Sequence, residues 1–193
     1  FDVDAFLNII DFYIERNDPV KALQVIDYAK QQHPASVEFL LREAQLLGMV
    51  ERPNEALSIL GNAEKLSPTD PDIYMIRGSI YSQQQKFELA IENFNKAIPL
   101  ATELDLLYLN IAYVYESWGD YDKAIKYLKL CLDDNQENEI ALYEIAFCFE
   151  FTDKLDDSVA FYKQFIDRCP YSFPAWYNLG NVHNRRGDFE DAL

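Results

Sequence analysis

The sequence contains few of the residues that interrupt or crosslink a chain. Among its 193 residues there are six glycines, eight prolines and three cysteines. So little glycine and proline excludes collagen-like and low-complexity disordered proteins, which need far more of both. Cys131, Cys148 and Cys169 are an odd number with no CxxC spacing, so a disulfide framework or a zinc site is not expected. We expect them to be small buried apolar residues in a reducing compartment, which favours a cytoplasmic location.

Positive charge is also scarce. Lys and Arg number 17 against 33 Asp and Glu, a formal net charge of -16, and the longest basic run is Arg185-Arg186. Nucleic acid is therefore not an expected partner, because binding it requires basic groups that neutralise phosphates. A basic or mixed-charge protein surface is the better candidate. The alternative is that the excess acid only keeps the protein soluble.

Long uncharged apolar runs are absent. No stretch reaches the roughly 18 apolar residues that a membrane-spanning helix needs, so no membrane span is expected. The sequence begins at Phe1 without Met and ends at Leu193, early in a predicted helix. We therefore expect a fragment of a longer chain, and a signal peptide or further domains stay open.

Motifs that carry catalysis are missing as well. There is no glycine-rich phosphate loop, GxSxG elbow, HExxH motif or paired cysteine ligand. His33 and His183 are the only histidines, and neither has a second ligand at helical spacing. We expect His183 to be a buried, hydrogen-bonded core residue. The pairs Asp133-Asp134 and Asp156-Asp157 lie at turns or helix starts, where capping explains them. We expect no enzyme activity, no cofactor and no metal.

What the sequence does contain is a pattern that recurs every 34 residues. Large apolar, small and Gly-Asp positions in YLNIAYVYESWGDYDKA recur 68 residues later in FPAWYNLGNVHNRRGDFEDAL. Self-similarity at this spacing is the mark of a repeat protein. The predicted repeats are 3–36, 37–70, 71–104, 105–138, 139–172 and a partial 173–193. Apolar residues at i, i+3, i+4 and i+7 predict two helices in each repeat.

Capping residues mark the predicted helix boundaries. Proline follows Asp18 and Arg52 at helix starts, and Gly-Asp pairs at Gly119 and Gly187 join a helix end to the next N-cap. Three prolines end second helices, and the polar residue two positions later is expected to cap the next helix. These pairs are Pro34 with Ser36, Pro68 with Asp70, and Pro170 with Ser172.

Small residues recur where two helices should cross closely, since a larger side chain would overpack the contact. They are Ala22, Ala56, Ala90, Ala124, Ser158 and Ala192 early in the second helix, and Ala29, Ala63, Ala97 and Cys131 late in it. Three residues depart from the pattern. Glu43 and Arg77 stand at apolar positions and predict incomplete burial or snorkelling side chains. Pro99 predicts an early end or a bend of its helix.

Together these features resemble the tetratricopeptide repeat, a helix-turn-helix unit. The resemblance covers essentially the whole chain and implies one all-α domain over 1–193, a right-handed superhelical solenoid of about eleven helices in antiparallel pairs. It also implies a non-catalytic scaffold that binds a peptide or protein segment in a concave groove lined by the first helices. Members of one subgroup hold a partner's C-terminal carboxylate with a Lys at the fifth place of the repeat. This sequence has no Lys there, so that ligand is not expected.

Carried onto this chain, the groove positions are acidic in the first two repeats and aromatic with acidic neighbours in the last three. The candidate peptide-binding residues are Leu109, Tyr113, Glu116, Tyr143, Glu144, Phe147, Glu150, Phe151, Tyr177, Asn181 and Arg185. The rings would hold apolar anchors of the ligand, and the glutamates would favour Lys or Arg beside them.

Three alternatives stay open. The rings can instead pack on one another or on further repeats. The chain can be the sensor or targeting arm of a longer enzyme or regulator. Finally, its two ends, Phe1–Tyr13 and Phe189–Leu193, can pair with another copy and make the protein an oligomeric scaffold.

Overall fold

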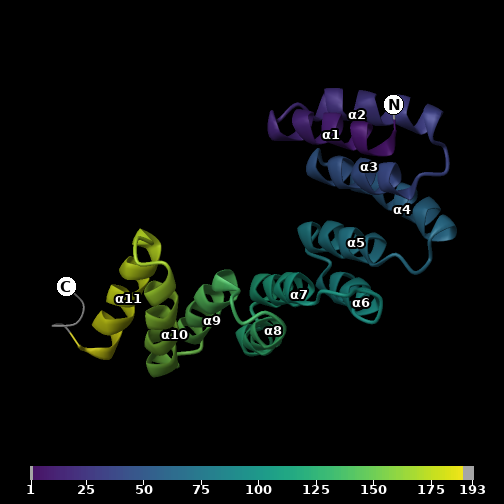
Figure 1. The fold of residues 1–193 in the computed structure, drawn as a ribbon. Helices are drawn as coiled ribbons and strands as arrows, with labels where there is room; N and C mark the ends of the chain where they lie inside the picture. The colour runs from purple at the N-terminus through teal and green to yellow at the C-terminus, as the bar shows by residue number, and fades with distance from the viewer. Residues whose placement is uncertain (1, 189–193) are drawn as a thin grey trace. The chain divides into compact units, whose positions relative to one another are not determined.

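The structure, a computed structural model, describes residues 2–188, and these residues form helices joined by short turns (Figure 1). No strand occurs within 2–188. The helices are α1 (Val3–Glu15), α2 (Pro19–Gln32), α3 (Val37–Met49), α4 (Pro53–Leu66), α5 (Pro71–Gln83), α6 (Phe87–Ala97), α7 (Asp105–Trp118), α8 (Tyr121–Asp134), α9 (Glu139–Phe151), α10 (Leu155–Arg168) and α11 (Phe173–Arg186).

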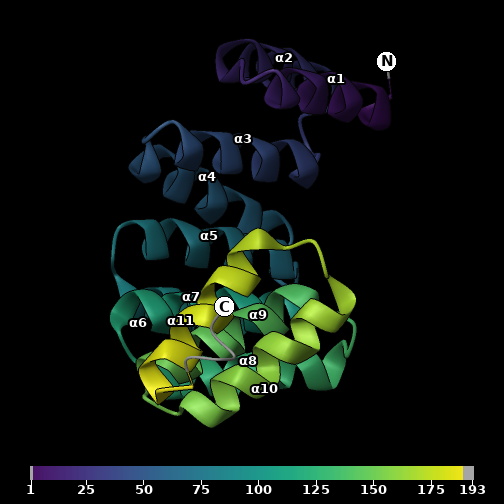
Figure 2. The same cartoon turned by 90° about the vertical axis from the view of Figure 1, so that its left-hand side faces the viewer.

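The helices follow the 34-residue period. The odd-numbered helices begin at Val3, Val37, Pro71, Asp105, Glu139 and Phe173, which are the predicted repeat starts. Each odd-numbered helix from α1 to α9 is followed by a tight turn and a second helix that packs against it, as in α7 with α8 and in α3 with α4 (Figure 2). The predicted all-α class of paired helices is therefore confirmed.

The chain divides into two compact units. The N-terminal unit, Phe1–Leu100, holds α1 to α6, and the C-terminal unit, Ala101–Leu193, holds α7 to α11. The last helix of the N-terminal unit, α6, has 11 residues, whereas α2, α4, α8 and α10 have 14. It ends at Ala97, two residues before Pro99, whose missing N–H cannot continue the helix. The predicted early end is confirmed.

The predicted N-caps are partly correct. The carboxylates of Asp18, Asp70 and Asp120 each accept a backbone N–H in the following helix at 3.0–3.1 Å. Ser36 and Ser172 occupy cap positions without capping through their side chains, so those two predictions are wrong. The Ser36 hydroxyl instead donates a charge-assisted hydrogen bond to the Glu38 carboxylate at 2.6 Å. Nothing in the structure explains Ser172.

One turn residue in every repeat has a left-handed backbone. Gly119 and Gly187 end α7 and α11 with φ of 82° and 84°, a region in which glycine is unstrained. The same place in the other four repeats is occupied by residues with side chains at φ of 55–59°, namely Asn17, Glu51, Gln85 and Asp153. The helix predicted after Gly187-Asp188, with Ala192, lies outside the described residues.

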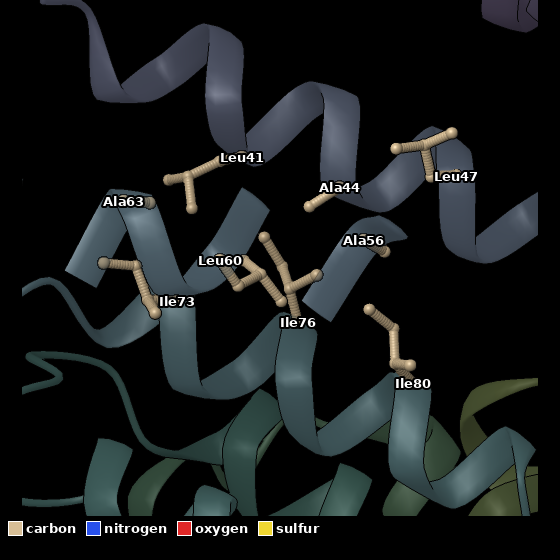
Figure 3. Close-up of a cluster of buried hydrophobic side chains, with 9 residues drawn as sticks. All are labelled: Leu41, Ala44, Leu47, Ala56, Leu60, Ala63, Ile73, Ile76 and Ile80. Atoms are coloured by element: carbon tan, nitrogen blue, oxygen red, sulfur yellow. The ribbon is translucent and has the colours of Figure 1, made fainter. Parts of the chain in front are cut away.

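The small positions lie at the helix contacts, as predicted. The alanines named above within the described residues, together with Cys131 and Ser158, are fully buried. The Ser158 hydroxyl donates to the Ala146 carbonyl oxygen at 2.8 Å, so its burial leaves no unsatisfied donor. Figure 3 shows the arrangement in the N-terminal unit, where Ala44, Ala56 and Ala63 lie among leucine and isoleucine side chains of α3, α4 and α5.

Glu43 and Arg77 do not snorkel into solvent. Their side chains are only 13% and 14% exposed, and each pairs with an opposite charge on the second helix of the preceding repeat. Lys30 Nζ lies 2.6 Å from Glu43 Oε2, and Arg77 Nη2 lies 2.7 Å from Glu64 Oε2. Incomplete burial is confirmed, and ion pairing takes the place of snorkelling.

His183 is buried, as predicted, at 3% exposure. The predicted hydrogen bond is not made by Nδ1, which has no hydrogen-bond partner within 2–188. The nearest carboxylate, that of Asp188, has an oxygen 3.6 Å from it. His183 is thus a packing residue of α11.

Candidate interaction surface on the C-terminal unit

All eleven candidate residues lie on the first helices of the C-terminal unit, α7, α9 and α11. Their spacing of three or four residues places them along one side of each helix. Side-chain contacts join the helices. Cys148 on α9 contacts Glu116 on α7, and Asn178 and Arg185 on α11 contact residues of α9. We call the set the groove surface: Leu109, Tyr113, Glu116, Tyr143, Glu144, Phe147, Glu150, Phe151, Tyr177, Asn181 and Arg185.

Two carboxylates form the centre of the groove surface. Glu116 and Glu144 are both partly buried, and burial raises the pKa of each. For Glu116, burial and then the charge of Glu144 raise the pKa to about 7, although the Cys148 thiol, donating to Glu116 Oε1 at 3.4 Å, opposes the shift. Within the described residues neither carboxylate has a cationic partner. Both therefore carry an uncompensated cost of charge burial.

Tyr113 lies beside these carboxylates. Its side chain is 36% exposed, and burial followed by the charges of Glu144 and Glu116 raises its pKa to about 12. The phenol therefore stays neutral at physiological pH and can donate to Glu144. This interaction in turn lowers the pKa of Glu144, against the larger effect of burial.

The other rings pack partly on one another. Phe147 and Phe151 have centroids 4.7 Å apart, and Phe151 stacks on Tyr121 at 4.8 Å. Tyr143 meets the edges of Tyr162 and Phe165 on α10 and accepts a hydrogen bond from Asn178 at 2.8 Å. Mutual packing of candidate rings is therefore seen for Phe147 and Phe151, whereas Tyr143 packs on rings of α10 outside the candidate set. Phe151 nevertheless stays 55% exposed.

The remaining members differ in accessibility. Leu109 is 4% exposed and belongs to the core, whereas Tyr177 is 61% exposed. Arg185 donates to Glu150 Oε1 and to Asp153 Oδ1, both at 3.1 Å, so Glu150 already has a cation beside it. Asn181 is half-buried. The accessible, unpaired part of the groove surface thus lies around Tyr113, Glu116 and Glu144.

Two contributors were not predicted from the sequence. Cys148 donates to Glu116, and burial together with the Glu116 charge raises the pKa of its thiol, so it stays protonated. Tyr121, from a second helix, supports Phe151. Cys148 lies 32 residues after Glu116, close to the repeat period, and that spacing could have indicated the contact.

Along residues 2–188 no helix is long and apolar enough to cross a bilayer. In the same range no three or more His, Cys, Asp or Glu side chains are grouped in a way that could hold a metal ion.

Family models described as tetratricopeptide repeat match four stretches of the chain, 71–102, 106–137, 140–172 and 161–193. Their union covers more than half of the sequence. The matches 71–102, 106–137 and 140–172 follow the helix pairs of repeats three to five, and 161–193 runs from α10 through α11.

Two curated relatives match most of the chain. The chain is 21% identical over 160 residues to "TPR repeat-containing protein YpiA" of Bacillus subtilis (strain 168), covering 82% of this chain and 38% of that protein. It is 22% identical over 190 residues to "BBSome complex member BBS4" of Bos taurus, covering 97% of this chain and 36% of that protein. The chain thus spans less than two fifths of the length of these relatives.

Solved structures show the same fold. The structure titled "Functional Characterization of Pseudomonas Aeruginosa pilF" matches with a TM-score of 0.82 at 16% identity over 98% of this chain and 86% of that one. YrrB, titled "a TPR protein with an unusual peptide-binding site", matches with a TM-score of 0.68 at 21% identity over 87% of both chains. The 34-residue helix pairs, the buried small residues at their crossings and these matches together show that the chain belongs to the tetratricopeptide repeat family.

Proposed function

We propose that this chain is a non-catalytic protein-interaction scaffold whose groove surface binds a partner segment that carries Lys or Arg next to an apolar residue. Members of the family are generally protein-interaction scaffolds, which supports the broader statement. The observation that carries the specific one is the pair Glu116 and Glu144, partly buried without a cation.

A cationic side chain from a partner would remove the cost that burial places on these carboxylates. In a partly desolvated site two negative charges repel each other, and a hydrogen-bonded cation between them reverses the sign of that interaction. Tyr113, on the same face of α7 as Glu116, offers a ring to the alkyl stem or to the cation itself. The ligand's basic residue would therefore lie between α7 and α9.

Apolar contacts would come from the exposed rings. Phe151 and Tyr177 are 55% and 61% exposed, and burial of one large apolar side chain of the partner is worth about 1.5–3 kcal/mol. Because Phe151 is held by Phe147 and Tyr121, little side-chain entropy would be lost on binding. A ligand with an apolar residue next to its basic residue fits a carboxylate pair on α7 and α9 and exposed rings on α9 and α11.

The comparisons support a binding role without naming a partner. YrrB is described by its title as having a peptide-binding site, and BBS4 is described as a member of a complex. Since this chain spans only part of the relatives' length, a role as the sensor or targeting arm of a longer enzyme or regulator is compatible with the same binding function.

The test removes the two charges without changing the side-chain size. A labelled decapeptide containing Phe, Lys and Leu should bind the wild type and bind Glu116→Gln/Glu144→Gln at least about tenfold more weakly. Its analogue with norleucine for Lys should bind both proteins equally weakly. The matched control, Glu103→Gln/Asp133→Asn, removes two charges from exposed positions of the same unit. If the control variant lost as much affinity as Glu116→Gln/Glu144→Gln, the loss would come from net charge alone, and the proposal would be refuted.

A second candidate, self-association, is favoured by one observation. On α1, Ile9 and Phe12 lie one turn apart and are 37% and 46% exposed, and neighbouring exposed apolar side chains can mark an interaction surface. Sedimentation equilibrium of wild type and Ile9→Glu/Phe12→Glu would test it. A wild type that stays monomeric at high concentration would exclude this candidate.

A further inference from the structure

A cavity of about 450 Å³ opens on the C-terminal unit where the α7–α8 turn approaches the end of α9. We call it the turn-edge cavity, and its lining residues are Trp118, Gly119, Asp120, Tyr121, Asp122, Lys123 and Thr152. None of them belongs to the groove surface. We propose that this cavity is a second binding site and that it takes a proline-rich segment in the extended polyproline conformation.

Two rings of the cavity are held in place by other rings. Trp118 is 43% exposed and stacks on Tyr115, with centroids 6.2 Å apart and planes 5° apart. Tyr121 stacks on Phe151 at 4.8 Å and 23°. Rings that are fixed before a ligand arrives lose little entropy when it binds. The cavity therefore presents preformed aromatic faces.

The charges at the rim are already satisfied within the protein. Lys123 Nζ lies 2.6 Å from Asp120 Oδ2, and Lys154 Nζ lies 2.8 Å from Asp122 Oδ1. All three charged side chains that line the cavity are thus paired. Because each of these side chains already has a partner of opposite charge, none of them requires a charge on the ligand, and an uncharged ligand is favoured.

The walls also exclude a ligand that binds through its backbone as an added strand, because they are helix ends and a turn. The N–H groups of Gly119 and Asp120 bond to the carbonyl oxygens of Glu116 and Tyr115, both at 2.9 Å. The Thr152 hydroxyl bonds to the Cys148 carbonyl at 3.2 Å. A polyproline helix needs no such partner, since its backbone stays solvated while its proline rings pack on aromatic faces.

A similar cavity two repeats earlier provides an internal comparison. It measures about 400 Å³ in the N-terminal unit and is lined by Gly48, Met49, Glu51, Pro53, Ile80, Gln83 and Gln84. At the position of Tyr121 it has Pro53, and at the position of Trp118 the chain has Val50. The shape recurs with the repeat, but the rings do not, so proline recognition is expected only in the C-terminal unit.

The two tryptophans of the chain allow a direct test. In Trp176→Phe, Trp118 is the only tryptophan, and its fluorescence reports on the turn-edge cavity. Titration with a decaproline peptide should give a saturable change, whereas a Gly-Ser decapeptide should give none. By calorimetry Tyr121→Ala should bind decaproline about tenfold more weakly, and Met49→Ala in the N-terminal cavity should bind as the wild type does. No saturable change, or the same change with the Gly-Ser peptide, would overturn the proposal.

Two further variants separate this site from the groove surface and from loss of folding. Glu116→Gln/Glu144→Gln should keep its affinity for decaproline, and a loss there would refute a separate site. Thermal unfolding followed by circular dichroism checks that Tyr121→Ala is folded. If it is not, Trp118→Leu replaces it, and wild-type affinity for decaproline in that variant would equally overturn the assignment.

Discussion

The two units bury the same repeat position with different chemistry. In the N-terminal unit the seventh place of the first helix is Glu43 in α3 and Arg77 in α5, each paired with a charge 13 residues earlier, whereas in α1 it is the exposed Ile9. In the C-terminal unit it is Ile145 and Leu179, which are 0% and 5% exposed. Ile166, 13 residues before Leu179, belongs to the same apolar cluster. The repeat therefore determines where the two helices touch, and the contact itself can be an ion pair or an apolar pair.

The charged contacts also reverse sign from one repeat to the next. Lys30 faces Glu43, whereas 34 residues later Glu64 faces Arg77. A partly buried ion pair adds little net stability over an apolar pair, but an unpaired charge at the same place is costly. The reversed order would thus disfavour the pairing of a helix with the wrong neighbour. We infer that the N-terminal unit uses charge to set the order of its repeats.

The largest effect on stability is expected at the close contact between Gly78 and the Phe94 ring. A Cβ on Gly78 would lie 2.8 Å from the Phe94 ring, which is 1% exposed and cannot move aside. Gly78→Ala should therefore destabilise the N-terminal unit by about 1–3 kcal/mol. The equivalent residues of the C-terminal unit are Ala146 and Tyr162, where an alanine is accommodated. Denaturant unfolding of the wild type and of Gly78→Ala would measure the loss in free energy of unfolding.

Gly61→Ala is the control for that substitution. A Cβ there has no atom within 4 Å, so the helix propensity of alanine should raise stability by about 0.5–1 kcal/mol. Destabilisation by both substitutions would show that the close contact of Gly78 is not the cause.

A smaller effect is expected from reversing one charge. Glu43→Arg places a cation against Lys30 and should cost about 1–2 kcal/mol, between the values for exposed and fully buried pairs. Adding Lys30→Glu recreates the order found at Glu64 and Arg77 and should restore most of the loss. Thermal unfolding of the wild type, both single variants and the double variant measures the coupling. Additive losses in the double variant would contradict the role of the pair.

The same pair can be replaced by the apolar chemistry of the C-terminal unit. Lys30→Leu/Glu43→Leu should leave stability unchanged or raise it slightly, since a packed apolar pair avoids the desolvation of two ions. The melting temperature of this double variant should be higher than that of Lys30→Leu alone, because the single variant leaves Glu43 without its cation. A double variant less stable than the single one would disprove the comparison.

The smallest effect is expected in the pH dependence of stability. The pKa of Glu116 is raised to about 7 in the folded protein, so the folded state binds its proton more tightly than the unfolded state. Its contribution to stability is then greatest below the unfolded pKa and is lost as pH rises toward 7. Glu116→Gln should show a flatter decline of melting temperature between pH 4.5 and about 7 than the wild type. Parallel curves would contradict this assignment.

Ligand binding should respond in the opposite direction. Since protonated Glu116 does not attract a cation, the proposed Lys or Arg ligand should bind more weakly at pH 6 than at pH 8. Glu144→Gln should keep part of this dependence, and Glu116→Gln should lose most of it. Binding titrations at the two pH values would measure the change.

The sequence predicted the fold because its evidence is local and repeated. Pro99 ends α6 through a missing N–H, and the alanines recur at every helix contact, so neither depends on distant residues. The ion pair of Arg77 with Glu64 was not predicted, because a charged residue at an apolar place does not reveal its partner on another helix. Gly119 and Gly187 marked two helix ends in the sequence, whereas nothing marked Glu51 and Gln85, which adopt the same left-handed backbone.

The candidate site was predicted less completely, for a similar reason. The repeat register placed Tyr113, Glu116 and Glu144 on first helices, and the structure gives their contacts. The register did not indicate that Arg185 pairs with Glu150 or that Leu109 is covered. Such details depend on side-chain reach between helices, which spacing along one helix does not determine.

The left-handed residue in each turn has a consequence for how this protein can be improved by engineering. Residues other than Gly, Asn and Asp are disfavoured in this backbone region by about 1 kcal/mol or more. The turns at Glu51 and Gln85 therefore hold a reserve of stability that glycine would release, whereas Asn17 and Asp153 adopt the region at lower cost. The turns lie in separate repeats, so the gains should add. The protein could thus be stabilised by substitutions in its turns alone, with every helix surface unchanged.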